Sequence, residues 1–304
     1  MLPGLLLFRL QSLNATENIM EATIVIPAYN EEKGIAAVVA EINEVMTKSG
    51  HVFEVVVVDD GSTDATLKAA RGTSARVIEH AVNRGYGQSI LTGMAEARHD
   101  VIVTIDADSS YAAQDIPKLL EESQKFAMVI GQRTGAQYRG RLLKYPARVA
   151  FRRLAEYISG ESIPDINSGL RVFRKSAYNL LPKAHECRGF SFSTTTTLLF
   201  LAAGYSARFV PVEYRHRSGD SKINYYRDTL RALQILLEIG IHFNPLKIVL
   251  PMALAPLALS AGFLAASLAG GAALYLTPAV LCFGLALLIF GIGMILLQIK
   301  VSGR

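Results

Sequence analysis

Charged side chains are absent from residues 248–299, although Asp, Glu, Lys and Arg make up 19% of the 304-residue chain. Such a run predicts membrane segments after a soluble part; the alternative is a pair of core helices in a soluble protein. The run divides near residues 269–271, which predicts two spans at about 246–269 and 274–298. Each span is close to the ~20 apolar residues that a bilayer crossing requires. Small residues in the paired spans and at their junction could allow association with another copy, as a homo-oligomer: Gly262, Ala265 and Gly270.

Cysteine is also scarce, with Cys187 in the soluble part and Cys282 in the second predicted span. This separation excludes a disulfide framework and a cysteine-rich metal site. The apolar start of the chain has neither a basic region nor a cleavage site of the secretory type. We therefore expect residues 1–19 to be a peripheral extension, with Met20 standing immediately before the first strand.

The net charge of +5 indicates an anionic partner. Lys247 precedes the first predicted span, Lys300 and Arg304 follow the second, and the loop between the spans carries no charge. By the positive-inside tendency, this pattern places the large N-terminal part in the cytoplasm. The sequence thus predicts a multi-pass protein of the inner (plasma) membrane, with membrane lipids and no nucleic acid as partners.

Strands and helices alternate through the soluble part, residues 20–220. This order predicts an α/β fold with a mostly parallel, doubly wound sheet. Helices are expected at Glu31–Lys48, after a cap at Ser62 or Thr63, and at about 86–98. The expected strands are Thr23–Pro27, Phe53–Asp59, Arg76–His80, Val101–Asp106 and Met128–Gly131.

Ligands of such sheets bind beyond the carboxyl ends of the strands. Asp106 and Asp108 follow an apolar run there, and two carboxylates can share a hard divalent cation that also takes diphosphate oxygens. An acidic surface turn is the alternative. Asp59 and Asp60 precede a Gly-Ser-Thr turn, where they could accept hydrogen bonds from a base or ribose, or cap a helix.

The ordered motifs resemble glycosyltransferase family 2, with its inverting GT-A fold. The motifs at residues 166–174, 189–192 and 217–222 narrow the resemblance to the polyprenyl-phosphate sugar transferases, the branch that contains dolichyl-phosphate mannose synthase and bactoprenol glucosyltransferases. The motifs that carry the family resemblance are Ile24-Val-Ile-Pro-Ala-Tyr-Asn-Glu-Glu32, Val58-Asp-Asp-Gly-Ser-Thr-Asp64, Asn83-Arg-Gly-Tyr-Gly87 and Asp106-Ala-Asp108.

The resemblance implies a nucleotide-sugar donor, a polyprenyl-phosphate acceptor and Mg²⁺ or Mn²⁺ held by Asp106 and Asp108. The residues that it assigns to the donor are Pro27, Ala28, Tyr29, Glu31, Asp59, Asp60, Asn83, Arg84, Asp106, Ala107 and Asp108. Those assigned to catalysis are Asp106, Asp108, Arg133, Ser168, Arg217 and Lys222. Those assigned to the acceptor phosphate are Arg133, Lys144, Arg148, Arg217 and Lys222.

Three positions depart from the family pattern. His216 stands where an arginine is usual, so Arg215 or Arg217 could take its role. Ser109-Ser110-Tyr111 replaces the usual Leu-Gln-His, which leaves a third metal ligand open. Thr195 stands where relatives often carry Glu. A phosphate monoester needs no general base, because its second pKa of about 6 leaves it mostly ionised.

Two basic segments are expected to lie at the membrane surface. Residues 133–153 carry seven basic residues and no acid, and a helix at about 143–159 would have an apolar side. A solvated basic face is the alternative. A second amphipathic helix is expected within 221–245, directly before the membrane part, 246–304. Together they would seat the catalytic edge against anionic headgroups.

Two other functions fit the same fold. A processive polysaccharide synthase depends on a Gln-x-x-Arg-Trp motif, and the chain contains no tryptophan. A non-catalytic nucleotide-binding scaffold would not need Asp106, Asp108, Arg133 and Lys222 together. The sequence therefore predicts transfer of one sugar to a polyprenyl phosphate, without naming the sugar. The resemblance to bacterial members of the family implies a UDP-sugar rather than a GDP-sugar as the donor.

Overall fold

The computed structural model describes residues 19–134, 145–182, 191–215, 225–270 and 273–302. Within this part a seven-stranded sheet has the order β3-β2-β1-β4-β6-β5-β7. Its strands are β1 (Glu21–Ala28), β2 (Val52–Asp59), β3 (Arg76–Glu79), β4 (Val101–Thr104), β5 (Met128–Thr134), β6 (Arg171–Arg174) and β7 (Ala207–Glu213).

The sheet is mostly parallel, as predicted. β1 pairs in parallel with β2 and β4, β2 with β3, and β5 with β7. β6 lies antiparallel between β4 and β5. The sequence analysis anticipated neither β6 nor β7. Because the chain inserts β6 from a distant segment, this reversal depends on contacts that local periodicity does not encode.

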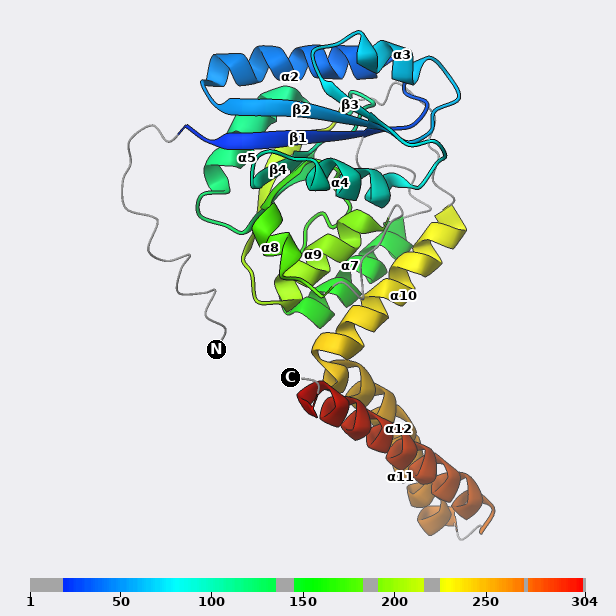
Figure 1. The fold of residues 1–304 in the computed structure, drawn as a ribbon. Helices are drawn as coiled ribbons and strands as arrows, with labels where there is room; N and C mark the ends of the chain where they lie inside the picture. Colours follow the sequence, from blue (N-terminus) through cyan, green and yellow to red (C-terminus); the bar gives the residue numbers. More distant parts are fainter. Residues whose placement is uncertain (1–18, 135–144, 183–190, 216–224, 271–272, 303–304) are drawn as a thin grey trace.

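Helices cover both faces of the sheet (Figure 1). Side chains alternate along each strand, so Ile24 and Ile26 face one core and Val25 faces the other. The first core is closed by α2 (Ile35–Ser49), α3 (Thr66–Arg71) and α5 (Ile116–Glu122). The second is closed by α4 (Tyr86–Ala95), α7 (Tyr145–Ser159), α8 (Lys175–Asn179), α9 (Phe192–Ala202) and α10 (Tyr225–Phe243).

Two predicted helix starts were wrong. α2 begins at Ile35 and not at Glu31, because the Glu31 amide donates to Thr66 Oγ1 (2.7 Å) and is drawn into the neighbouring loop. The predicted cap at Ser62 or Thr63 also differs. α3 begins at Thr66 with Ala65 at its N-cap position, and Asp64 Oδ1 accepts a hydrogen bond from the Thr66 amide at 2.9 Å just before the helix.

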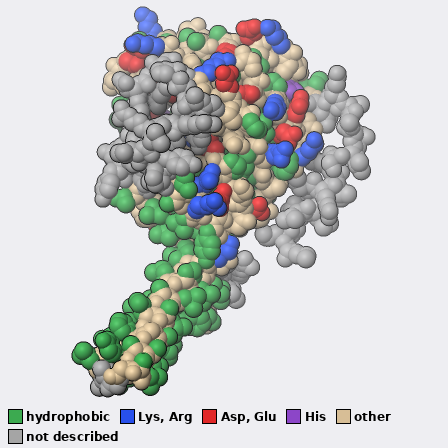
Figure 2. All heavy atoms as spheres, turned by 180° about the vertical axis from the view of Figure 1, so that it is seen from behind, with side chains coloured by type: hydrophobic (Ala, Val, Ile, Leu, Met, Phe, Trp, Pro, Cys, Tyr) green, Lys and Arg blue, Asp and Glu red, His purple; other side chains and the backbone are tan. Residues whose placement is uncertain are grey.

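The C-terminal part is a hairpin of α11 (Pro245–Gly270) and α12 (Leu276–Ser302), joined through a 3-10 turn at Ala273–Tyr275. Both helices are long and apolar enough to cross a membrane. Figure 2 shows hydrophobic side chains over this hairpin, whereas Lys and Arg gather on the globular part. The helices approach closely, since a Cβ on Gly293 would lie 2.4 Å from Val249 Cγ1.

A set of reciprocal hydrogen bonds joins the hairpin to the sheet domain. Lys247 Nζ donates to the carbonyl oxygens of Tyr157 (3.1 Å) and Ile158 (3.2 Å) near the end of α7. The Tyr157 hydroxyl donates in return to the Lys247 carbonyl oxygen at 2.8 Å. A positive charge is favourable at the carboxyl end of a helix. We call these contacts the Lys247 junction.

Candidate active site

Four loops meet at the carboxyl ends of β1 to β4, and we call this edge of the sheet the rim. Hydrogen bonds knit the first two loops together: Asn30 N donates to Ser62 Oγ (3.0 Å), and Thr63 N donates to Asn30 Oδ1 (2.8 Å). The first loop also touches the fourth, since a Cβ on Gly34 would lie 2.6 Å from the Ala107 carbonyl oxygen. The rim is therefore a connected surface.

Asp106 and Asp108 lie on this rim, directly after β4. Asp108 is 5% exposed, and its Oδ1 accepts a hydrogen bond from Ser110 N at 3.0 Å. Ser109, directly after Asp108, has a φ of 60°, a left-handed conformation that is uncommon for a residue with a side chain and often found at functional sites. Asp106 is half-buried and accepts a hydrogen bond from the Tyr86 hydroxyl at 3.0 Å.

Tyr86 and Gly169 hold Asp106 from two directions. Burial, followed by the negative charge of Asp106, raises the pKa of the Tyr86 phenol well above its usual value, so the hydroxyl remains a donor. A Cβ on Gly169 would lie 2.5 Å from both carboxylate oxygens of Asp106. The sequence analysis missed both roles, although each residue belongs to a quoted motif, because a motif does not show which distant carboxylate its residues approach.

The donor set suits a hard divalent cation. Carboxylate oxygens are the ligands that Mg²⁺ prefers, and Mg²⁺ usually takes one or two carboxylates together with substrate phosphates. In the part of the chain that the structure describes, no three His, Cys, Asp or Glu side chains form a possible metal site. A cation on Asp106 and Asp108 could also take ligands from diphosphate and water.

Asp59 fits a nucleoside contact. Its side chain is buried, and its Oδ2 accepts a hydrogen bond from Ser62 N at 3.1 Å. Its Oδ1 is buried without a hydrogen-bond partner among the described residues. Burying an acceptor in this way is costly, and a ligand N–H or O–H would relieve the cost.

Asp60 has a different surrounding. It is 3% exposed, and its oxygens accept hydrogen bonds from Arg84 N (2.9 Å) and Gly85 N (2.8 Å). Asp60 therefore organises the loop after β3, and its contact with a nucleoside stays a prediction. The other predicted donor residues also lie on the rim loops or at the end of β1, and their contacts stay predictions: Pro27, Ala28, Tyr29, Glu31, Asn83, Arg84 and Ala107.

Arg133 is bound by an acid that the sequence analysis did not single out. Its Nε and Nη2 donate to the two oxygens of Asp165 at 2.8 Å and 2.9 Å, and the Asp165 side chain is 1% exposed. The guanidinium carbon also lies 5.4 Å from the centroid of the Tyr214 ring. The pairing fixes the direction of the guanidinium, and its contact with an acceptor phosphate stays a prediction.

Ser168 is fully buried behind the rim. Its Oγ lies 3.3 Å from the Tyr111 hydroxyl, which in turn accepts a hydrogen bond from Gly169 N at 2.8 Å. Burial also raises the pKa of the Tyr111 phenol. These contacts support the backbone that carries Gly169, and a direct catalytic role of Ser168 stays a prediction.

Arg171 is a fully buried cation that the sequence analysis missed. Its guanidinium donates to the carbonyl oxygens of Ser168 (2.6 Å) and Ser193 (2.9 Å) and to Thr197 Oγ1 (3.2 Å). Burial lowers its pKa, and negative charge on neighbours such as Asp106 acts in the opposite direction. Its positive charge thus offsets acidic side chains at the rim.

Several predicted acceptor residues lie outside the described residues: Lys144, Arg217 and Lys222, together with the side chain of Arg148, whose backbone belongs to α7. Tyr214 and Arg215, which lie just before residue 216, contact the rim. Arg215 N donates to the Ser110 carbonyl oxygen at 2.8 Å, and Tyr214 forms a bridge with Tyr111. The Arg215 guanidinium itself contacts Glu41 at 3.1 Å.

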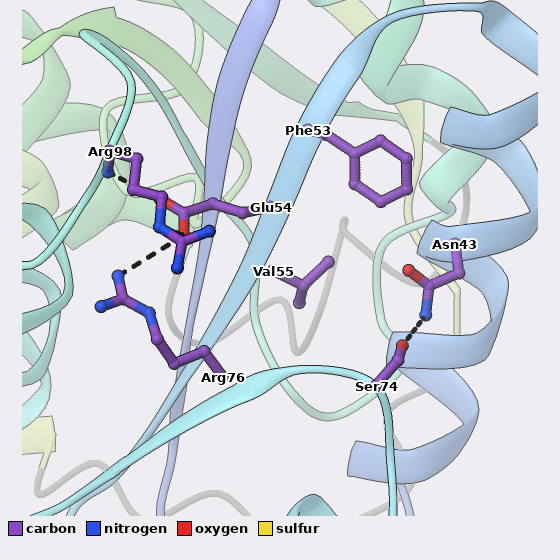
Figure 3. A pocket seen from close by; sticks show the side chains of 7 residues that line it. All are labelled: Asn43, Phe53, Glu54, Val55, Ser74, Arg76 and Arg98. Atoms are coloured by element: carbon purple, nitrogen blue, oxygen red, sulfur yellow. Dashed lines mark hydrogen bonds and ion pairs between the residues drawn. The ribbon is translucent and has the colours of Figure 1, made fainter.

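A cavity of about 310 Å³ lies away from the rim (Figure 3). Its lining includes Phe53, Glu54 and Val55 from the first half of β2, whereas Asp59 ends that strand. Arg76 and Arg98 converge on Glu54, with N to O distances of 3.5 Å and 3.7 Å. The carboxylate thus offsets their charge, and this cavity is not part of the rim.

The family model described as Glycosyl transferase family 2 matches residues 23–181. Among curated proteins, a dolichyl-phosphate hexose transferase of Haloferax volcanii is 32% identical over 67% of this chain and 87% of its own. An undecaprenyl-phosphate 4-deoxy-4-formamido-L-arabinose transferase of Salmonella paratyphi B is 27% identical over 78% of this chain and 79% of its own.

Solved structures show the same fold. Glucosyl-3-phosphoglycerate synthase from Mycobacterium tuberculosis, in a complex with Mg²⁺ and UDP, aligns with a TM-score of 0.60 at 20% identity. The alignment covers 73% of this chain and 79% of that one. Its complex with Mn²⁺, UDP-glucose and phosphoglyceric acid aligns with a TM-score of 0.58, over 73% and 80% of the two chains. The α/β fold of the GT-A type is thereby confirmed.

Proposed function

Because the chain belongs to glycosyl transferase family 2, we propose that it moves one sugar from a nucleotide-sugar to a polyprenyl phosphate, with inversion at the anomeric carbon. One observation carries the proposal: the paired carboxylates Asp106 and Asp108 are held at the rim of a chain that also has a hairpin fit to cross a membrane. Relatives named for polyprenyl-phosphate acceptors match over 67% and 78% of the chain, which supports this acceptor class.

On the donor side, we assign the nucleoside to the buried Asp59 and the diphosphate to the side of Asp106 and Asp108. Mg²⁺ or Mn²⁺ on these two carboxylates would stabilise the charge of the departing nucleoside diphosphate. Tyr86 and Gly169 hold Asp106 before any donor arrives, so the site does not have to reorganise on binding. We expect the nucleotide to be UDP.

On the acceptor side, the chain supplies charge and position. The position that often carries an acid in relatives is Thr195, which is 2% exposed and donates to the Ser191 carbonyl oxygen at 2.9 Å. A threonine hydroxyl is too weak a base to take a proton from an acceptor, which favours a phosphate over a sugar hydroxyl. The residues proposed to bind this phosphate, by charge-assisted hydrogen bonds, are Arg133, Lys144, Arg148, Arg217 and Lys222.

The proposed site faces a membrane. α7 and α10 present exposed apolar side chains, such as Tyr157 and Leu230, each 49% exposed. α10 leads directly into α11, so an acceptor could be reached without leaving the bilayer. We propose an inner-membrane location with the domain of residues 20–220 in the cytoplasm and 221–245 at the interface.

The test uses the full-length protein in detergent with undecaprenyl phosphate, Mn²⁺ and a panel of UDP-sugars, with mass detection of the lipid product. We expect one sugar per lipid and release of UDP only when the lipid is present. Asp108→Asn should lower the rate by about 100-fold or more, because a metal ion contributes several kcal/mol to such reactions.

Asp100→Asn is the matched control, since Asp100 lies just before β4, at the opposite end of the strand from Asp108. It should keep near-normal transfer. A product that grows to many sugars would show a processive synthase instead. Full biological activity without both rim carboxylates would indicate a scaffold.

A further inference from the structure

A buried histidine connects the ends of β2 and β3 to the start of α4. His80 is 6% exposed, and its Nδ1 lies 2.7 Å from Asp60 Oδ1. Its Nε2 lies 3.0 Å from Thr92 Oγ1 in α4. An ionised carboxylate only accepts hydrogen bonds. The hydrogen therefore sits on Nδ1, which donates a hydrogen bond to Asp60.

Asp60, held by His80, in turn fixes the loop before Tyr86. Its two oxygens accept hydrogen bonds from Arg84 N (2.9 Å) and Gly85 N (2.8 Å). Gly85 has a φ of 97° and a ψ of 156°, a conformation open only to glycine, and it immediately precedes α4. The amides that define where α4 begins are thus both tied to one carboxylate.

Tyr86, the first residue of α4, delivers the contact that matters at the rim. Its hydroxyl donates to Asp106 Oδ1 at 3.0 Å. The position of this hydroxyl depends on where α4 begins. His80 restrains that helix at both of its contacts, through Asp60 at the start and through Thr92 further along.

We infer that His80 is a positioning residue for the metal-binding carboxylate Asp106, acting through Asp60, the Arg84–Gly85 amides and Tyr86. The inference rests on the proposed function, because it takes Asp106 as a metal ligand. Residues that orient metal ligands commonly contribute about 10- to 100-fold to metal affinity. His80 touches neither metal nor substrate and belongs to none of the residues assigned to them above.

The test measures the binding of Mn²⁺ to the full-length protein in the presence of UDP, from the loss of the free-Mn²⁺ paramagnetic resonance signal. It needs neither sugar nor lipid, so it does not depend on the proposed acceptor. His80→Leu should raise the Mn²⁺ dissociation constant on the order of tenfold. His80→Asn, whose amide can still donate to Asp60, should restore most of the affinity.

Tyr86→Phe should weaken Mn²⁺ binding about as much as His80→Leu. If His80 acts through Tyr86, the double variant should be no weaker than the weaker single variant, because the same restraint is lost once. Additive losses would overturn the inference. In transfer assays, His80→Leu should raise the Mn²⁺ requirement far more than it lowers the rate at saturating Mn²⁺.

His99→Leu is the matched control. His99 also pairs with a carboxylate, Glu21 at 3.3 Å, but this carboxylate belongs to the first residue of β1, at the far end of that strand from the rim. Its Mn²⁺ binding should equal that of the wild type. Unchanged Mn²⁺ affinity in a folded His80→Leu protein would overturn this inference and leave the proposed function untouched. A wild-type protein that binds no Mn²⁺ would overturn the proposed metal site as well.

Discussion

At the scale of single residues, the site depends on positions where the residue must lack a side chain or must adopt an unusual backbone conformation. Asn30 and Ser109 have φ values of 53° and 60°, and both lie in rim loops. Gly34 and Gly169 let backbone come against Ala107 and Asp106, with no room for a Cβ. Strain of this kind persists only where the surrounding structure imposes it. Here hydrogen bonds across the loops impose it.

Gly169→Ala should displace the Asp106 carboxylate, since the new methyl group would lie 2.5 Å from both of its oxygens. We expect Mn²⁺ affinity with UDP to fall by at least about tenfold. The free energy of unfolding should fall by only about 1–3 kcal/mol, as for other overpacked sites. Mn²⁺ titration and thermal unfolding measure the two effects.

Gly284→Ala is the control for this substitution, because a Cβ there meets nothing within 4 Å. It should leave Mn²⁺ affinity unchanged, and it should not lower the free energy of unfolding, because Ala is at least as favourable as Gly inside a helix. Normal Mn²⁺ binding by Gly169→Ala would show that Asp106 is not held from this side.

At the scale of elements, close packing and a buried hydrogen bond hold the two helices of the hairpin together. Ser260 Oγ in α11 donates to the Ala279 carbonyl oxygen in α12 at 2.7 Å. Gly293 of α12 meets Val249 of α11. Small residues let helix backbones approach in a membrane, where van der Waals contact replaces the hydrophobic effect between helices.

Gly293→Leu should separate the two helices, since a Cβ there would already lie 2.4 Å from Val249 Cγ1. Overpacking costs about 1–3 kcal/mol, and each kcal/mol corresponds to about 2–4 °C in Tm for a chain of this size. We expect a lower Tm in detergent by several degrees. Gly291→Leu, with open space around its Cβ, should keep the wild-type Tm. Equal Tm values for both variants would contradict the close contact of α11 and α12 at Gly293.

At the scale of the whole molecule, the proposed transfer would require the rim to be held at a set height above the membrane. The Lys247 junction is suited to this, because it ties the end of α7 to the first turn of α11. α10 packs beside it, where a Cβ on Gly240 would lie 2.6 Å from Ile248 Cδ1. The sheet domain and the hairpin are thus joined by hydrogen bonds and packing contacts as well as by the continuous chain.

Lys247→Met keeps the apolar stem and removes the two hydrogen bonds that Nζ donates to α7. We expect transfer to undecaprenyl phosphate to fall severalfold, because these two hydrogen bonds help to fix the hairpin relative to the sheet domain. Mn²⁺ and UDP binding should stay unchanged. Lys48→Met is the control, since Lys48 pairs with Glu44 on its own helix, α2. Equal loss of UDP binding and transfer would contradict a role in orientation.

Local patterns in the sequence were enough to predict much of this protein. The charge-free run predicted both hairpin helices, and alternation of strands and helices predicted the sheet and the rim. Asp106 and Asp108 could be placed on that rim because carboxyl ends of parallel strands share one edge. The hairpin helices, the sheet and its rim could be predicted because hydrophobic periodicity indicates the type of each element and the face that it buries.

Only the tertiary structure decided which side chains meet at the rim. His80 with Asp60, Tyr86 with Asp106, and Arg133 with Asp165 are pairs separated by 20 to 32 positions in the chain. The antiparallel β6, inserted between β4 and β5, decides that Gly169 lies against Asp106. No local pattern encodes these contacts, because they depend on how separate elements pack around the shared sheet.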